Sequence, residues 1–397
     1  VRVHTRGNEK MMIKDGHVLM WTHGMFWVCM EWDVGTVGRA ASEFGYLNSG
    51  FEKLGEELQY NQYAAITDRM NHLSPICNNV AYALSAEKLM DIEVPKRARY
   101  IRLLMCELSR IADHFLSVGM QAVDLGAFTV FLYGFRLRED IYDLFEIATG
   151  TRLTTSYTRV GGLMRDLPDG FETAVLDVLE EAGKVADEIE TLLNHNRIFQ
   201  KRTKGVGVIS KEDANSYGIS GPAARAAGID WDLRIKEPYS DYEEFDFDVV
   251  IGVNGDVFDR YLVRMEEIRQ SVKICRQVLD KMPEGEINID ADSKFILPPK
   301  DDVYDSIEGL IYHFEQIMPN RGMTPPKGEA YVATESPNGE LGYYIVSDGS
   351  RTPYRVRTRP PSLMNYSIFS KIMTGRMISD AVAILGSLNI IAGELDR

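Results

Sequence analysis

The sequence has few cysteines, and none stands at the spacing of a metal site. Its four cysteines, Cys29, Cys77, Cys106 and Cys275, are far apart, with no CxxC pair and no Cys/His pair at ligand spacing. We therefore expect neither a structural zinc site nor an iron–sulfur cluster held by this chain alone. Cys106 and Cys275 fall on apolar helical patterns, which predicts small buried hydrophobic residues in a reducing compartment.

Long apolar runs and an excess of positive charge are also lacking. No stretch approaches 18 consecutive apolar residues, because polar residues and glycine interrupt the most apolar windows, 18–30 and 381–392. We expect no membrane span, and the opening residues show no signal-peptide pattern that would indicate export. The 44 Lys and Arg residues against 59 Asp and Glu give a net charge of −15, which argues against nucleic acid as a partner.

What is present is typical of a folded globular protein. Of 397 residues 45% are hydrophobic and 26% charged, and the length allows one large domain or two to three smaller ones. The charge is uneven: 237–248 holds six acids and no base, whereas Arg355, Arg357 and Arg359 alternate along one face of an expected strand. Solvated faces are the favoured interpretation of both stretches, and docking surfaces for other subunits are the alternative.

The pattern along the chain predicts an α+β fold with a central bundle of long helices. Glycine-punctuated short runs over 1–61 indicate a β-rich N-terminal region, and helical periodicity dominates 62–200. The segment 201–397 is expected to be a mixed α/β region packed on the bundle, so that the whole forms one compact unit. The stripe that best illustrates the bundle is Ile101, Leu104, Leu108, Ile111 and Phe115.

The C-terminal region shows helical stripes at 257–282, 304–318 and about 375–388. Between the last two, 328–359 alternates strand-like runs with the turn dipeptides Asn338-Gly339 and Asp348-Gly349. These dipeptides are strong hairpin signals, so this stretch predicts a three-stranded antiparallel meander.

Charged residues stand where the bundle should be apolar. Glu107 and Arg110, or Arg110 and His114, are spaced to share one helix face. Asp124 has no charged residue within nine positions on either side. A buried carboxylate needs a partner, or its pKa rises. A helix cap or structural ion pair and a functional charge site are both open for Asp124.

Three histidines differ in the roles their surroundings suggest. His114, on a helix beside Asp113, favours a structural role. His72 precedes Ser74-Pro75 at a helix break, where structural and site roles are equally open. His23 follows an apolar run and precedes Gly24 on a turn, a position where functional residues concentrate.

Several blocks in order carry a resemblance that covers almost the whole chain. The chain resembles the D (49-kDa) subunit of respiratory complex I, NADH:quinone oxidoreductase. The blocks are GYLNSGFEKLGEE, DIEVPKRARYIRLLMCELSRIADH, DLGAFTVFLYGFRLREDIYDLFE, RVGGLMRDLP, GDVFDRYLVRMEEIRQSVK, PKGEAYVATESPNGELGYYIVSDGSRTPYRVR and the final AILGSLNIIAGELDR.

The resemblance implies a fold related to the large subunit of nickel–iron hydrogenases. Those proteins hold their metal with two CxxC pairs, which this chain lacks, so no metal site is expected. It implies instead a quinone pocket shared with a neighbour that carries the terminal [4Fe-4S] cluster. The iron–sulfur chemistry would then belong to partner subunits, while this chain binds no cofactor by itself.

The resemblance also implies roles for three residues. The family's G-P-x-H-P-x-x-H-G loop aligns its last histidine, a ligand of the quinone headgroup, with His23. A second headgroup ligand, a tyrosine after D-R-[LM]-[DN], aligns with His72, which still donates hydrogen bonds but titrates near neutral pH. The aspartate that partners the loop histidine aligns with Asp124. His23, His72 and Asp124 are therefore the expected catalytic residues, and His23 and His72 the expected quinone ligands.

The function implied is quinone reduction coupled to proton pumping by an NADH-dependent translocase of the respiratory chain. Expected partners are the terminal-cluster subunit, the C-type subunit, the ferredoxin-like two-cluster subunit and the membrane heel subunit, with membrane contact only through partners. The expected location is peripheral, on the cytoplasmic side of the bacterial inner membrane.

The alternative is a scaffold subunit of a complex I-like or hydrogenase-like membrane complex, structural rather than catalytic. It is favoured by four departures from the family's motifs, at Leu19, Asn48, His72 and Thr154, each replacing a histidine or tyrosine found in many members.

Overall fold

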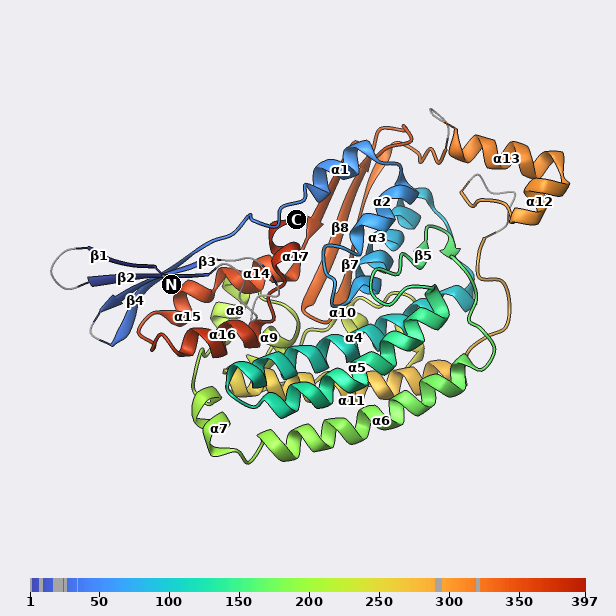
Figure 1. Ribbon diagram of the computed structural model, residues 1–397. Coiled ribbons are helices and arrows are strands. Elements are labelled where there is room, and N and C mark those ends of the chain that lie inside the picture. The colour runs from blue at the N-terminus through green and yellow to red at the C-terminus, as the bar shows by residue number, and fades with distance from the viewer. Residues whose placement is uncertain are drawn as a thin grey trace.

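The computed structural model describes residues 2–6, 10–16, 24, 27–33, 35–289, 295–318 and 322–397. It is α+β, as predicted. An N-terminal sheet projects from one side of a helical body, and a second sheet lies within the body (Figure 1). Among the described residues, no helix has both the length and the apolar character needed to cross a bilayer.

The N-terminal sheet is antiparallel, with strands in the order β1 (Arg2–Arg6), β2 (Lys10–Gly16), β3 (Trp27–Asp33) and β4 (Thr36–Glu43). Val28 and Met30 of β3 and Val37 and Ala40 of β4 are buried against the C-terminal helices. In β3 the buried residues alternate, which is the period-2 pattern of a strand with one face in the core. In β4 they are three positions apart, beside an irregularity in the pairing with β3.

The body is organised around α4 (Lys96–Asp124), which packs against α5 (Phe128–Thr149) and α11 (Val257–Asp280). Figure 1 shows α4, α5, α6 (Phe171–Leu193) and α11 running side by side. Pro95 immediately precedes α4, where the fixed φ of proline suits a helix start. The apolar stripe predicted from 97–118 lies in the main core cluster.

The predicted meander is confirmed. β7 (Gly328–Ser336), β8 (Gly339–Ser347) and β9 (Arg355–Arg359) form an antiparallel sheet, and Ser336 pairs with Gly339 across the first turn. The sheet packs on α3 (Pro75–Met90).

The remaining elements are shorter and connect these layers. They are α1 (Phe51–Glu57), α2 (Tyr60–Thr67), β5 (Thr158–Arg159), β6 (Gly162–Leu163), α7 (Arg197–Thr203), α8 (Lys211–Tyr217), α9 (Gly221–Ala226), α10 (Leu233–Lys236), η2 (Tyr242–Glu244), α12 (Lys300–Asp305), α13 (Ile307–Ile317), α14 (Pro361–Ser367), α15 (Phe369–Met373), α16 (Asp380–Leu388) and α17 (Ala392–Asp396).

Two predicted helices differ from the structure at their ends. The stripe at 304–318 is divided between α12 and α13, because Ser306 adopts an extended conformation and its Oγ accepts a hydrogen bond from Gly309 N at 2.9 Å. This is an N-cap, which starts a new helix. The last predicted helix begins at Asp380 rather than about 375, since Gly375 has a φ of 79° and closes a turn there.

The alternating arginines share one face of β9, as predicted, and they form ion pairs with acidic residues of the same chain. Arg357 binds Glu52 at 3.0 Å and Arg355 binds Glu56 at 2.7 Å, which joins β9 to α1. In the acidic stretch, Asp241 binds Arg99 at 2.7 Å. Both charged stretches therefore contribute to intramolecular ion pairs.

The predicted burial of Cys106 and Cys275 is confirmed, and both are free cysteines. Within the described segments, no group of three or more His, Cys, Asp or Glu side chains is placed to hold a metal ion.

Candidate functional site

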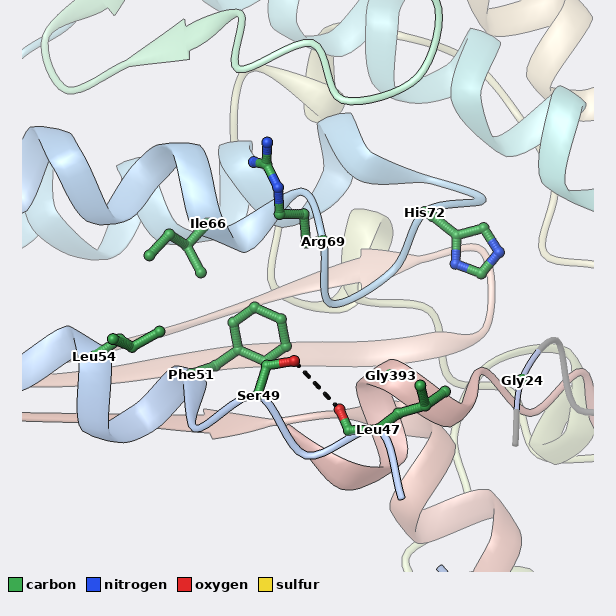
Figure 2. A pocket seen from close by; sticks show the side chains of 9 residues that line it. All are labelled: Gly24, Leu47, Ser49, Phe51, Leu54, Ile66, Arg69, His72 and Gly393. Atoms are coloured by element: carbon green, nitrogen blue, oxygen red, sulfur yellow. Dashed lines mark hydrogen bonds between the residues drawn. The ribbon is translucent and has the colours of Figure 1, made fainter. Parts of the chain in front are cut away.

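A mostly apolar pocket of about 560 Å³ opens where the N-terminal segment, α1, α2 and α17 meet. Figure 2 shows Leu54 and Ile66 at one end of it, and His72 and Gly24 at the other. Such a volume suits a small organic molecule with an apolar body and a few polar contacts. The lining residues are Gly24, Leu47, Ser49, Phe51, Leu54, Ile66, Arg69, His72 and Gly393.

The polar part of the wall is the turn between α2 and α3. Asn71 is buried, and its Oδ1 accepts hydrogen bonds from Leu73 N at 3.0 Å and Ser74 N at 3.3 Å. Pro75 follows at the first position of α3 and fixes the direction of the chain. His72, between these constraints, is therefore presented on a turn with little freedom.

Asp68 anchors the start of the same turn. Its Oδ2 accepts hydrogen bonds from Ser156 N at 2.7 Å and Ser156 Oγ at 2.9 Å. Burial raises the pKa of Asp68 to about 6, although the bonds from Ser156 oppose the shift. The turn is thus tied to the loop before β5.

His72 is exposed at the pocket wall. The surrounding protein lowers the pKa of its imidazole by desolvation, and the nearby charge of Arg138 lowers it further, while Asp113 opposes both. A pKa below the ordinary value leaves the ring neutral at pH 7, so that it presents one N–H donor and one acceptor.

The expected ligand His23 lies outside the described residues, as does Leu19, one of the four departures from the family's motifs. The neighbouring Gly24 is described and is tightly packed. A Cβ at this position would lie 2.6 Å from Leu47 Cδ1 and 2.7 Å from Ala392 Cβ. Only glycine fits there without movement of its neighbours.

Asp124 is the last residue of α4 and does not line the pocket. Its Oδ2 is buried, with no hydrogen-bond partner in the part of the chain that the structure describes. Burial raises the pKa of Asp124 to about 6. Neither a capping bond nor an ion pair to Asp124 is found among the described residues, and its functional role stays a prediction.

Sequence reasoning had not connected Arg138 and Asp113 with His72. Arg138 is buried between the rings of Phe135 and Tyr142, with its guanidinium carbon 5.4 and 4.7 Å from their centroids. It forms no carboxylate ion pair within the described ranges. A charged residue in the apolar run of α5 could have marked Arg138 as a candidate site residue. Its proximity to His72, however, depends on how α5 packs in the folded chain.

The other buried charges form a network inside the body. Glu107 accepts hydrogen bonds from Tyr242 Oη and Ser271 Oγ, each at 2.6 Å, and from Arg234 at 3.2 Å. Its predicted pairing with Arg110 is confirmed at 3.3 Å. Burial alone would raise the pKa of Glu107, but Arg110 and Arg234 lower it to about 2. The network therefore carries stable charges.

The structural role favoured for His114 is confirmed, although its partner is not the residue suggested by helix spacing. His114 Nε2 lies 2.9 Å from Glu267 Oε2 on α11, and Glu267 also accepts from Arg225 at 2.8 Å. The alternative pair of Arg110 and His114 is not formed, because each side chain has a carboxylate partner of its own.

Fold and pocket together define a class: an α+β protein in which a long-helix bundle, stabilised by buried ion pairs, carries a histidine-bearing apolar pocket at its edge. Residues 124–397 match the family described as respiratory-chain NADH dehydrogenase, 49 Kd subunit. The chain belongs to this family of D subunits of NADH:quinone oxidoreductase, and is thus part of an oxidoreductase complex of the respiratory chain.

Three relatives illustrate the similarity. The chain is 48% identical over 389 residues to the NADH-quinone oxidoreductase D subunit of Geotalea uraniireducens, covering 98% of this chain and 99% of the relative. It is 48% identical to the D subunit of Methylacidiphilum infernorum, covering 98% and 92% of the two chains. It is 47% identical to the C/D subunit of Bdellovibrio bacteriovorus, covering 98% of this chain and 69% of that longer one.

Proposed function

We propose that the pocket binds the headgroup of a quinone and that this chain is the quinone-site subunit of its complex. The observation that carries the proposal is His72, a neutral hydrogen-bonding group held on a constrained turn at one end of a mostly apolar pocket. Leu54, Phe51 and Ile66 offer apolar surface to an isoprenoid chain, while His72 meets a quinone oxygen.

His23 is the proposed second headgroup ligand. It directly precedes Gly24, which lines the pocket and packs closely against Leu47 and Ala392. A quinone held between His23 and His72 would have a hydrogen-bonding side chain near each of its oxygens.

Reduction of a quinone takes two electrons and two protons. The described part of this chain has no set of side chains for a metal or cluster, so we propose that electrons come one at a time from a terminal [4Fe-4S] cluster in a neighbouring subunit. His72 and His23 supply protons to the quinone oxygens. Burial raises the pKa of Asp124 to about 6, so that its protonation can change in response to the charge on His23.

Proton pumping would follow from a change of charge at this site. Glu107 on α4 and Arg234 on α10 are paired in the buried body, where the low dielectric strengthens the effect of any added charge. We propose that this network passes the change toward the membrane arm, where protons are moved.

Assembly with other subunits is part of the proposal. The relative from Bdellovibrio bacteriovorus is named as a C/D subunit, with both letters on one chain, which supports a C-type subunit as a direct neighbour of this one. The other proposed neighbours are the terminal-cluster subunit, the ferredoxin-like two-cluster subunit and the membrane heel subunit.

We place the chain peripherally on the cytoplasmic side of the bacterial inner membrane, with a hydrogenase-like fold that has lost its metal.

The test is quinone reduction by the complex purified through a tag on this chain, with His23→Ala, His72→Ala and Asp124→Asn compared. We expect each variant to lower the rate at least tenfold, whereas His195→Ala, on an exposed turn, keeps it. Wild-type rates in all three variants would contradict the proposal.

The scaffold alternative is favoured by the departures from the family's motifs at Leu19, Asn48, His72 and Thr154, and a substitution at His72 tests it. If the natural complex reduces no quinone and His72→Tyr restores the activity, this chain is a structural subunit.

A further inference from the structure

The helix pair α12 and α13 carries an apolar surface that the rest of the described chain does not cover. Figure 1 shows the pair standing apart from the helical body. α12 packs on α13, and no comparable contact joins either helix to another element of the described chain. Of the residues in the two helices, only Gly309 is buried. The pair therefore presents most of its surface to the outside.

The apolar residues of α13 form one stripe along the helix. Ile307, Leu310, Ile311, Phe314 and Ile317 recur at intervals of three and four, which places them on one face. All five side chains are exposed, from 40% for Leu310 to 74% for Ile307. A stripe of this spacing usually faces the core of its own domain, whereas here it faces away from it.

The opposite face of α13 is the one turned toward the chain. A Cβ on Gly309 would lie 2.5 Å from the Asp302 carbonyl oxygen, so α12 closes directly on this side. Gln316, two turns further along, donates a hydrogen bond from its side-chain amide to the Ile296 carbonyl oxygen. At about 100° per residue, both positions lie away from the middle of the stripe. The way α13 is attached therefore turns its apolar face outward.

A helix attached in this way needs a further contact. α13 has 11 residues, and isolated helices of this length are marginal in water, because most helix stability in proteins comes from packing of the apolar face. Contiguous exposed apolar surface marks an interaction site, whereas single exposed apolar residues are ordinary. Leu176 on α6 is such a single residue, since Thr173 and Glu180, its neighbours on the helix surface, are polar.

The charge beside the stripe defines the kind of partner that fits. From Lys300 to Met318 the chain holds five acids and one base. In helical projection, Glu308 and Glu315 lie on the same edge of the stripe, beside Ile311. A complementary surface therefore offers an apolar groove with Lys or Arg side chains along the border that meets these glutamates.

We propose that α13 docks through its apolar stripe into a groove with a basic border on another subunit of the complex. The inference rests on the proposed assembly with other subunits, to which it assigns a surface. A second copy of this chain fits less well, because a symmetric contact would bring two acidic edges together. A bilayer also fits less well, since helices that lie on membranes carry Lys and Arg beside the apolar face, and anionic lipids repel acids.

The first experiment maps the contact by photo-crosslinking in the complex purified through a tag on this chain. The photoreactive analogue benzoylphenylalanine replaces Phe314. Illumination should attach it to one other subunit, at an apolar peptide with Lys or Arg within a few residues. The same analogue in place of Leu176 should not reach that peptide. A crosslink from position 314 to a second copy of this chain, to lipid or to nothing would overturn the proposal.

The second experiment weakens the contact. Ile307→Ser combined with Ile311→Ser should lower the co-purifying amount of the crosslinked subunit about tenfold or more, as loss of two interface anchors does. Its unfolding temperature should equal that of wild type, because the stripe is exposed in the chain itself. Leu176→Ser is the matched control and should keep every subunit. Glu308→Lys combined with Glu315→Lys should release the same subunit. Wild-type retention in either double variant contradicts the proposal.

Quinone reduction is measured on the same wild-type preparation, so that the two proposals fail separately. A complex that gives the crosslink but reduces no quinone contradicts the proposed function and leaves the docking surface in place. A complex that reduces quinone without a crosslink at Phe314 contradicts the docking surface alone.

Discussion

Gly24 and Ala392, from opposite ends of the chain, pack so closely that a Cβ on Gly24 would lie 2.7 Å from the Cβ of Ala392. Gly24 is thereby held against α17 at the edge of the pocket. Contact this close leaves no room for a side chain at position 24, so the packing depends on a glycine.

Gly24→Ala should therefore displace the loop and weaken quinone binding. We expect the KM for quinone to rise several-fold with a smaller change in kcat, since the loop positions a ligand rather than the electron donor. Gly183→Ala, inside α6 with nothing within 4 Å of its Cβ, is the matched control and should leave both constants unchanged. An unaltered KM in Gly24→Ala would show that the loop does not contact the quinone.

Asn71→Ala removes the two side-chain hydrogen bonds that hold the His72 turn. Their loss should cost about 1 kcal/mol of unfolding free energy and raise the KM for quinone. Asn196→Ala removes the same pattern of bonds at the start of α7, where Asn196 Oδ1 accepts from Ile198 N at 2.9 Å and Phe199 N at 3.2 Å. This control should cost a similar stability without a change in KM. If both variants have the same KM for quinone, the turn that carries His72 does not contribute to quinone binding.

Asp124→Asn should change how stability depends on pH. Because burial raises the pKa of Asp124 to about 6, its favourable contribution is present below the ordinary value of 3.8 and is lost as pH rises to about 6. Above that pH the native state carries a partly buried charge that no described residue neutralises. The Asp124→Asn variant should therefore unfold at a higher temperature than wild type above pH 6, and at the same temperature as wild type near pH 3.8.

The control for Asp124 is Asp280→Asn, at the exposed end of α11. Both residues end a long helix, so the comparison isolates burial from the helix dipole. A stabilisation of equal size in Asp280→Asn, or none in Asp124→Asn, would contradict the burial argument.

Glu107→Gln should destabilise the body strongly. It leaves Arg110 and Arg234 in the core without their shared carboxylate, and breaking a buried pair costs about 3–5 kcal/mol. Chemical denaturation of the purified chain measures this loss. Glu180→Gln, which breaks an exposed pair with Lys184, should give an unchanged denaturation midpoint. A loss below 1 kcal/mol, within the ~0–1 kcal/mol of an exposed pair, would mean that water reaches the network.

Local patterns in the sequence were sufficient for much of the fold. The stripe from Ile101 to Phe115 predicted α4, and Asn338-Gly339 predicted the turn between β7 and β8. The pairing of Glu107 with Arg110 followed from helix spacing alone. The boundary at Ser306 was missed, because a helical stripe continues across a cap that interrupts the backbone.

The candidate site was predicted less completely. His72 was singled out by a helix break, and it lines the pocket. Asp124 stood out as an isolated charge, and its side-chain oxygen is indeed buried without a partner in the described segments. The assignment of both to a quinone site came from family resemblance, not from the spacing of residues.

By itself, the sequence determined the elements of this protein, its family and the residue types at the pocket, because helix periodicity, turn dipeptides and motif order are local properties of the chain. Only the tertiary structure decided which charges are neighbours. His114 pairs with Glu267, and Arg138 and Asp113 act on His72. These relationships join distant segments through the packing of helices, and burial there lowers the pKa of both histidines.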